Sequence, residues 1–487
     1  MAKSLKEKTA SGLFWAAMNN GMMQLLNVVI GIVLMKLLSP EDYGLVGLLA
    51  IFSAIATTLQ ESGFTSALTN MKRPSANDYN SVFWFSSLMG LLLYAILFFS
   101  APLIAEFYHQ EKLVLLSRVC FLGILLSAIG IAPQAYLYKN LIVKEATYLR
   151  IGVLSVSGLV GITLAFAGKA YWSLVAQQLT YIALINIGKF FLTPWRPSWS
   201  VDFGPVRRMF AFSCKIMVTN IITQVSNNIL SVIFGKLLPL RTVGNFTQAY
   251  KWNNMASSLV SGTIAQVAQP VFASINDERA RQLAVLRKMM RFTAFLSFPV
   301  MLGLAIVSRE FIMLVSEKWA GCIPLLQILC IGGAFLPLYQ PLQNLIVSRG
   351  RSDVFMWCNI VQIALQIALI LLSSRFGVLI MVGVYTAFNI LWLLVWQQIA
   401  SRIIGLRLPS LQKDTAPFLL AAALASLVAT ATAWKIGSVP ASFAVKVVVA
   451  AAAYYGIMKL AGAEILRECT DYLFRLKAPQ RTKDAAD

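Results

Sequence analysis

Two lysines lie deep inside apolar stretches of the sequence, where a charged side chain is costly. Lys251 lies roughly nine residues into the stretch 243–270, and Lys215 lies roughly seven residues into the stretch 208–234. A charge in membrane hydrocarbon costs about 2.5–3.5 kcal/mol on insertion scales, so it faces water, an anion or a partner. Both lysines lie too deep to reach the membrane surface easily, and we predict that they contact an anionic substrate. Polar residues at three- and four-residue spacing continue the face of Lys251: Thr247, Asn254, Ser258 and Ser261.

Side-chain amides form two matching rows in the same apolar surroundings. One row lies in the first apolar stretch, residues 13–37, and the other lies in the stretch 208–234. Residues spaced by three or four positions share one face of a helix, so each row faces one way. We predict that these amides line a substrate cavity; the alternative is that they only hydrogen-bond between packed helices. The complete set of predicted substrate-binding residues is Lys215, Lys251, Asn20, Gln24, Asn27, Asn220, Gln224, Asn227 and Asn254.

Glu61 is the one carboxylate that falls inside these apolar stretches. It could bind a coupling cation or proton, or it could pair with a lysine of a neighbouring helix, and the sequence does not separate the two roles. Catalytic motifs such as GxxxxGK[ST], HExxH and GxSxG are absent from the sequence. The six cysteines include no CxxC pair, so we predict neither a disulfide nor a metal site. The chain is therefore expected not to be an enzyme, and to need no cofactor beyond a coupling cation or proton.

The chain that carries these residues is unusually apolar. Of its 487 residues, 58% are hydrophobic and 13% are charged, and the mean hydropathy is +0.71. Soluble domains are about 45–50% apolar and about 25% charged. The composition excludes a soluble enzyme with one membrane anchor, a disordered chain and a secreted disulfide scaffold, and it predicts an all-α polytopic membrane protein. About fourteen transmembrane helices are expected, at residues 13–37, 44–69, 80–104, 113–137, 146–167, 170–192, 208–234, 243–270, 290–308, 322–347, 354–374, 376–400, 416–434 and 440–460.

Positive charges are distributed unequally between the two sides of the membrane. If the N-terminus is cytoplasmic, the cytoplasmic segments hold about three times as many Lys and Arg residues as the outer segments. This bias predicts cytoplasmic N- and C-termini and accounts for the net charge of +21 without nucleic acid. The basic segment 272–290 is expected to form a cytoplasmic helix lying against the bilayer. Four other basic residues are expected to snorkel to the membrane surface: Lys36, Lys236, Arg118 and Lys446.

The sequence repeats itself at an offset of 200 residues. Of the 25 positions from Asn20 to Gly44, seven are identical to the positions 200 residues later. Six predicted helices separate the two copies, so both copies cross the membrane in the same direction and form two parallel six-helix lobes. The predicted domains are an N-lobe at 1–193, a cytoplasmic linker at 194–206, a C-lobe at 207–403, two accessory transmembrane helices at 404–462, and a cytoplasmic amphipathic helix and tail at 463–487.

Five segments resemble the Wzx-type polysaccharide flippases of the MOP exporter superfamily, and especially the lipopolysaccharide or colanic-acid branch. They are SLKEKTASGLFWAAMNN from Ser4, VLMKLLSPEDYGLVGLLAIF from Val33, TLQESGFTSALTNMKR from Thr58, FGKLLPLRTVGNFTQAYKW from Phe234 and SEKWAGCIPLLQILCIGG from Ser316.

This resemblance implies two six-helix lobes in a V shape, as in MATE transporters, with two additional C-terminal helices. It implies a substrate of undecaprenyl diphosphate carrying a short glycan, moved from the cytoplasmic to the outer leaflet of the bacterial inner membrane with an ion gradient. A polysaccharide polymerase or export complex is an expected partner. The basic residues that bind substrate vary in position within the family. The prediction that Lys215 and Lys251 bind substrate therefore depends only on their depth in the apolar stretches.

Three other functions remain open at this stage. A MATE-like drug or cation antiporter shares the implied fold, but more buried carboxylates would be expected for cationic substrates. A lipid II flippase also carries a diphosphate cargo. A membrane glycosyltransferase or polymerase is disfavoured because the outer loops are short and no Asp-x-Asp pair lies at a membrane surface.

Overall fold

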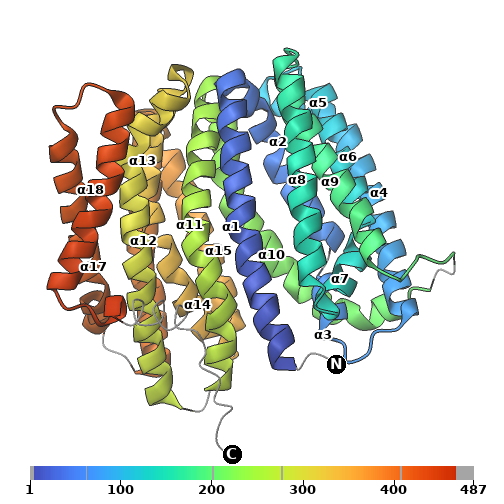
Figure 1. Cartoon of the computed structure of the whole chain (residues 1–487). Helices are drawn as coiled ribbons and strands as arrows, with labels where there is room; N and C mark the ends of the chain where they lie inside the picture. Colours follow the sequence, from blue (N-terminus) through green and yellow to red (C-terminus); the bar gives the residue numbers. More distant parts are fainter. Residues whose placement is uncertain (1–4, 62, 200–201, 276–277, 406–407, 468–487) are drawn as a thin grey trace, which may run out of the picture. The chain divides into compact units, whose positions relative to one another are not determined.

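The computed structural model describes residues 5–61, 63–199, 202–275, 278–405 and 408–467, and every regular element in these ranges is a helix (Figure 1). Each of the fourteen predicted spans coincides with one long helix or with consecutive short helices. The helices are α1 (Leu5–Leu37), α2 (Pro40–Glu61), α3 (Phe64–Asn70), α4 (Ala76–Tyr108), α5 (Leu113–Cys120), α6 (Leu122–Ala128), α7 (Ile131–Lys139), α8 (Val143–Phe166), α9 (Trp172–Leu192), α10 (Gly204–Leu237), α11 (Leu240–Ser274), α12 (Arg279–Val315), α13 (Cys322–Gly333), α14 (Tyr339–Ser348), α15 (Ser352–Ser373), α16 (Val378–Ile404), α17 (Leu408–Ala433) and α18 (Val439–Leu460).

The helices differ in whether their described residues are long and apolar enough to cross a membrane. Within the described residues, nine helices are long and apolar enough to cross a membrane, and a bent pair formed by α5–α6 and α7 would make a tenth. The long helices outside this set are α1, α9, α10 and α11, and the described side chains cover only part of α1, α10 and α11. These three helices carry the predicted amide and lysine rows. The all-α, multi-pass architecture is confirmed.

Two spans are broken within the membrane. The span Pro40–Asn70 breaks at Gly63, whose φ of 70° is left-handed and favours glycine, and α3 continues beyond the break. The second broken span bends by 43° between α6 and α7. A break leaves backbone groups without helical partners, so polar side chains must gather there.

Contacts divide the chain into two compact units, each described separately below. The first unit comprises Met1–Gln248 with Cys358–Ile367, and the second comprises Ala249–Trp357 with Ala368–Asp487. The boundary falls inside α11, and α10 packs against α2, α3 and α4 of the first unit. The predicted lobes were defined by internal similarity rather than by contacts, and they stay a prediction.

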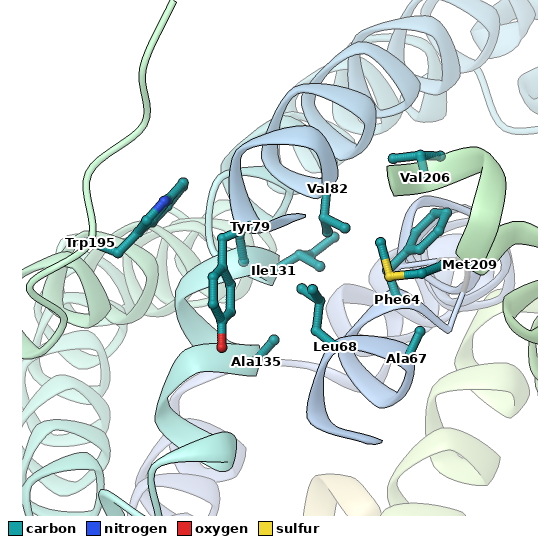
Figure 2. Close-up of a cluster of buried hydrophobic side chains, with 11 residues drawn as sticks. Phe64, Ala67, Leu68, Tyr79, Val82, Ile131, Ala135, Trp195, Val206 and Met209 are labelled. Atoms are coloured by element: carbon teal, nitrogen blue, oxygen red, sulfur yellow. The ribbon is translucent and has the colours of Figure 1, made fainter. Parts of the chain in front are cut away.

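A buried cluster in the first unit joins α3, α4 and α7 to the start of α10 (Figure 2). The predicted linker takes part in this cluster, because Trp195 packs near Tyr79 and its indole N–H donates to the carbonyl of Ala76 at 3.3 Å. Further hydrogen bonds tie the linker to α4, including one from the amide of Asn77 to the carboxylate of Asp202 at 2.8 Å. The linker is therefore attached to the N-terminal helices through specific polar contacts.

The prediction for the segment 272–290 fails in the second unit. The segment 272–290 was expected to lie on the bilayer surface, but its residues from Arg279 onward form the first turns of α12, which continues to Val315. The physical reason is a contact with α17, where Asp414 binds Arg287 and Arg291. Beyond residue 467, the predicted amphipathic tail lies outside the described residues.

Lys446 was predicted to snorkel to the membrane surface, but its side chain is nearly buried and pairs with a carboxylate. Its Nζ lies 2.6 Å from Oε1 of Glu310, and both side chains are nearly buried, with 12% and 10% exposed. Because α12 extends past residue 308, Glu310 is also an intramembrane carboxylate, so Glu61 is not the only one. Burial of either charge alone would be costly, and the pair compensates for it.

Two of the other basic side chains predicted to snorkel, Arg118 and Lys236, lie against aromatic rings. The guanidinium of Arg118 lies 4.4 Å from the ring centre of Phe98, and Nζ of Lys236 lies 4.9 Å from that of Phe107. Lys236 also donates to the carbonyl of Phe107 at 2.7 Å. The side chain of Lys236 is exposed, as expected of a residue at a helix end.

Candidate functional site

A polar cavity of about 390 Å³ lies inside the first unit, and Glu61 lines it. The walls come from α2, α3, α5, α6, α7 and α9, which meet where the two broken spans lose their helical hydrogen bonds. More than half of the lining residues carry a hydroxyl, amide or charged group. These residues are Ser53, Thr57, Gln60, Glu61, Thr65, Ser127, Gln134, Tyr138, Gln178, Asn186 and Lys189.

Two buried amides organise this cavity. Gln60 donates to the carbonyl of Ile124 at 2.7 Å and accepts a hydrogen bond from the hydroxyl of Ser127 at 2.7 Å. Asn186 on α9 donates to the carbonyl of Leu126 at 2.9 Å. Both amides thus satisfy carbonyls of α6 close to the bend before α7, which is what a broken span requires. This role was not predicted from the sequence. The available signal was that Gln60 and Asn186 are amides inside apolar stretches and belong to neither of the two amide rows.

Lys189 brings a positive charge to the same cavity. Its ammonium donates to Oδ1 of Asn186 at 2.8 Å, and Lys189 lines the cavity together with Glu61. Pairing of Glu61 with this lysine of a neighbouring helix stays a prediction. A role for Glu61 in ion coupling stays a prediction.

The predicted substrate-binding residues are distributed over both units. In the first unit, Gln24 and Asn27 on α1 and Gln224 on α10 are half-buried, whereas Asn220 on α10 is exposed. In the second unit, Lys251 on α11 is half-buried.

The other four predicted substrate-binding residues are Asn254, Asn20, Lys215 and Asn227. Asn254 lies one turn beyond Lys251 on α11, belongs to the same unit and is exposed. The side chains of Asn20, Lys215 and Asn227 lie outside the described ones, although their backbone is helical. The substrate-binding role of the set stays a prediction.

A close contact between α2 and α11 relates the two copies of the repeat. A Cβ atom on Gly44 would lie 2.5 Å from the carbonyl oxygen of Leu240, and one on Gly244 would lie 1.7 Å from that of Pro40. These two contacts are reciprocal, because Gly244 lies 200 positions after Gly44 and Leu240 lies 200 positions after Pro40. Reciprocal contacts are the signature of a two-fold relation between equivalent segments. Gly44 and Gly244 are among the seven matched positions, so the sequence contained this signal without revealing the contact.

Two further contacts join equivalent residues across the same axis. A Cβ on Gly47 would lie 2.7 Å from the hydroxyl of Thr247, and Nε of Arg241 lies 3.9 Å from Oε1 of Glu41. In both cases the two residues are 200 positions apart, so the contacts lie on the axis itself. This glycine contact, formed by residues 40–47 and 240–247, lies at the end of α2 that the charge distribution places outside.

These features match a known class of membrane transporter. The chain is similar to the lipid II flippase MurJ in an inward closed conformation, with a TM-score of 0.66, 16% identity, and 93% of this chain and 100% of that chain covered. It is also similar to a MATE-family multidrug transporter in an inward-facing conformation, with a TM-score of 0.62, 16% identity, and coverage of 80% and 96%. The fold is that of the MOP-superfamily transporters.

The chain belongs to the family of polysaccharide biosynthesis proteins, which matches residues 33–324. It is 24% identical to the lipopolysaccharide biosynthesis protein WzxC of Escherichia coli K12 over 380 residues, which cover 76% of each chain. It is 25% identical to the teichuronic acid biosynthesis protein TuaB of Bacillus subtilis 168 over 428 residues, which cover 86% of this chain and 88% of TuaB. The resemblance noted in the sequence is confirmed.

Proposed function

We propose that this protein flips undecaprenyl-diphosphate-linked oligosaccharides from the cytoplasmic to the outer leaflet of the bacterial inner membrane. The observation that carries the proposal is the combination of membership in the polysaccharide biosynthesis family with a MOP-type transporter fold. The glycan would be used for a surface polysaccharide, and a polymerase or export complex would receive it. Both termini would lie in the cytoplasm, in keeping with the positive charges of the inner segments.

The proposed mechanism is alternating access. The diphosphate docks at Lys215 and Lys251, where charge-assisted hydrogen bonds favour an anion, and the glycan contacts the amide rows. The lipid tail stays in the bilayer. The glycine contact between α2 and α11 closes the outer side, and rocking of the repeats opens it. Glycine at this contact supports the proposal because smooth helix surfaces can separate without unlocking interdigitated side chains.

The leaflet that accumulates lipid-linked glycan after gene deletion tests this function. We expect intermediates to be trapped on the cytoplasmic face, together with loss of a surface polysaccharide. Accumulation of lipid II would instead assign a lipid II flippase, to which the structural similarity with MurJ gives some support. An unchanged lipid pool with altered drug sensitivity would contradict the proposal and favour a MATE-like exporter.

Substitution of the deep lysines tests the docking step. We expect Lys251→Ala and Lys215→Ala each to lower export at least about tenfold, because each removes a charge-assisted contact worth more than about 1.4 kcal/mol. Export is measured as surface polysaccharide in the complemented deletion strain. Lys435→Ala, at an exposed lysine, is the matched control and should export normally. Normal export by both deep-lysine variants would show that the diphosphate docks elsewhere.

Substitution of Glu61 by glutamine tests ion coupling. If Glu61 binds the coupling ion, we expect transport driven by an imposed ion gradient to fall at least about tenfold, while exchange without a gradient persists. Proteoliposomes with labelled lipid-linked oligosaccharide provide both measurements. Glu145→Gln, at an exposed carboxylate of the same unit, is the control. An unchanged gradient response in Glu61→Gln would assign Glu61 to charge pairing with Lys189.

A further inference from the structure

A small basic cavity lies at the end of α12 that the charge distribution places on the cytoplasmic side. Its volume is about 240 Å³, and it belongs entirely to the second unit. Half of its lining residues are cationic, and the rest include two apolar side chains and one carboxylate. The lining residues are Ala284, Arg287, Lys288, Arg291, Glu464 and Ile465.

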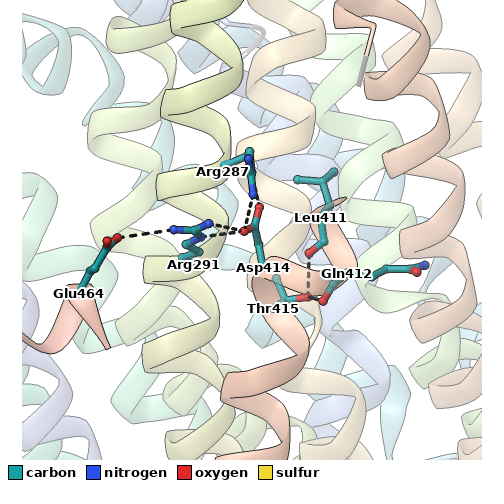
Figure 3. A network of polar contacts seen from close by, with 7 residues as sticks. All are labelled: Arg287, Arg291, Leu411, Gln412, Asp414, Thr415 and Glu464. Carbon is teal, nitrogen blue, oxygen red and sulfur yellow. Dashed lines mark hydrogen bonds and ion pairs between the residues drawn. The ribbon is translucent and has the colours of Figure 1, made fainter. Parts of the chain in front are cut away.

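Asp414 on α17 holds the two arginines of this cavity in place (Figure 3). Its side chain is only 3% exposed. Arg287 donates to it through Nε at 2.6 Å and Nη2 at 3.0 Å. Arg291 donates through Nε at 2.8 Å, and its Nη2 also lies 2.6 Å from the carboxylate. A guanidinium has five N–H donors in a fixed fork, so each arginine keeps donors beyond those that Asp414 engages.

In the part of the chain that the structure describes, the remaining arginine donors have no strong anionic acceptor within the cavity. Glu464 lies 3.8 Å from Nη1 of Arg291, which is too long for a hydrogen bond, and its side chain is 85% exposed. An exposed pair of this kind contributes little, because water and salt screen it. Three cationic side chains, those of Arg287, Lys288 and Arg291, face two carboxylates, Asp414 and the exposed Glu464, so the site carries a net positive charge.

We propose that this cavity binds the phosphate headgroup of an anionic phospholipid from the cytoplasmic leaflet. Arg287, Arg291 and Lys288 would contact the phosphate, and Asp414 is a positioning residue that orients both guanidinium groups. Basic pockets between membrane helices on the cytoplasmic side are suited to such headgroups.

A lipid fits better than free phosphate, because α12 continues from the cavity as an apolar helix along which an acyl chain can lie. Ala284 and Ile465 supply an apolar wall for the glycerol region. This inference holds whichever cargo the protein carries, since none of the residues that line the cavity belongs to the proposed cargo-binding set.

Binding of phosphatidylglycerol by the purified full-length protein tests the proposal. Native mass spectrometry would count retained lipid during titration with phosphatidylglycerol, phosphatidylcholine or inorganic phosphate. We expect Arg287→Gln combined with Arg291→Gln to weaken phosphatidylglycerol binding about tenfold. Arg281→Gln removes one positive charge from the same helix outside the cavity, as Lys288→Gln does inside it, and should leave binding unchanged.

Two single substitutions keep the test independent of folding, because they leave the Asp414 contacts intact. Lys288→Gln should weaken binding roughly threefold, and Glu464→Gln should strengthen it, since Glu464 competes with the phosphate for Arg291. The proposal is overturned if the cavity variants bind phosphatidylglycerol as wild type does. It is also overturned if Arg281→Gln is weakened equally, or if inorganic phosphate binds as tightly as the lipid.

Discussion

Gly244→Ala should abolish tight closure of the glycine contact and lower transport more than any other small substitution. The added Cβ would lie 1.7 Å from the carbonyl oxygen of Pro40, a backbone atom that cannot rotate away. Overpacking of this kind costs about 1–3 kcal/mol. A cost of about 2 kcal/mol would shift the equilibrium about thirtyfold toward forms in which α2 and α11 are separated.

Thiol labelling from outside the cell measures this shift. In a background without the native cysteines, Thr247→Cys places a thiol beside Gly47, inside the closed contact. We expect a membrane-impermeant maleimide to label this thiol faster when Gly244→Ala is present, and polysaccharide export to fall. Equal labelling rates with normal export would show that the contact does not close the outer side.

A second glycine on the same helix is the control for Gly244→Ala. A Cβ at Gly262 meets no heavy atom within 4 Å among the described residues. Alanine is favoured over glycine in a helix by about 1 kcal/mol, so Gly262→Ala should be neutral or stabilising. The same substitution is therefore expected to have opposite effects at two positions of α11.

Glu310→Gln and Lys446→Met should each destabilise the protein by about 3–5 kcal/mol, because removal of one partner leaves the other buried charge uncompensated. Lys446 also donates to the carbonyl of Ile306 at 3.0 Å, and Ser442 donates to Glu310 at 3.1 Å. The second carboxylate oxygen of Glu310 is buried and has no hydrogen-bond partner in the described part of the chain. The pair therefore depends strongly on its two charges.

Denaturant unfolding in detergent measures these losses. The double variant Glu310→Gln with Lys446→Met should lose much less than the sum of the single losses, since neither charge is then left alone. Lys435→Met, at an exposed lysine before α18, controls for the loss of a lysine and should unfold as wild type does. Single variants within about 0.5 kcal/mol of wild type would show that the pair contributes nothing to stability.

The positions of the helices could be predicted from the sequence because hydrophobicity is a local property. An apolar run of about 20 residues crosses a membrane whatever surrounds it, so every predicted span coincides with helix. Helix ends were less predictable. Arg309 and the basic run before residue 290 were interpreted as boundaries, yet α12 continues through both. The reason is tertiary. Asp414 pairs with Arg287 and Arg291, and Lys446 pairs with Glu310. Both partners lie more than 100 residues further along the chain, and they neutralise charges of α12.

Some features of the candidate sites were likewise determined by the sequence, and others only by the tertiary structure. The amide rows, the deep lysines, the repeat and the family resemblance follow from residue types and spacings, which the sequence determines alone. Only the tertiary structure brings Lys189 to the cavity of Glu61, packs Gly44 and Gly244 against equivalent backbone, and sets Asp414 between two arginines. Such contacts join residues far apart in the chain, and their energies depend on burial and angle, which a spacing along one helix does not specify.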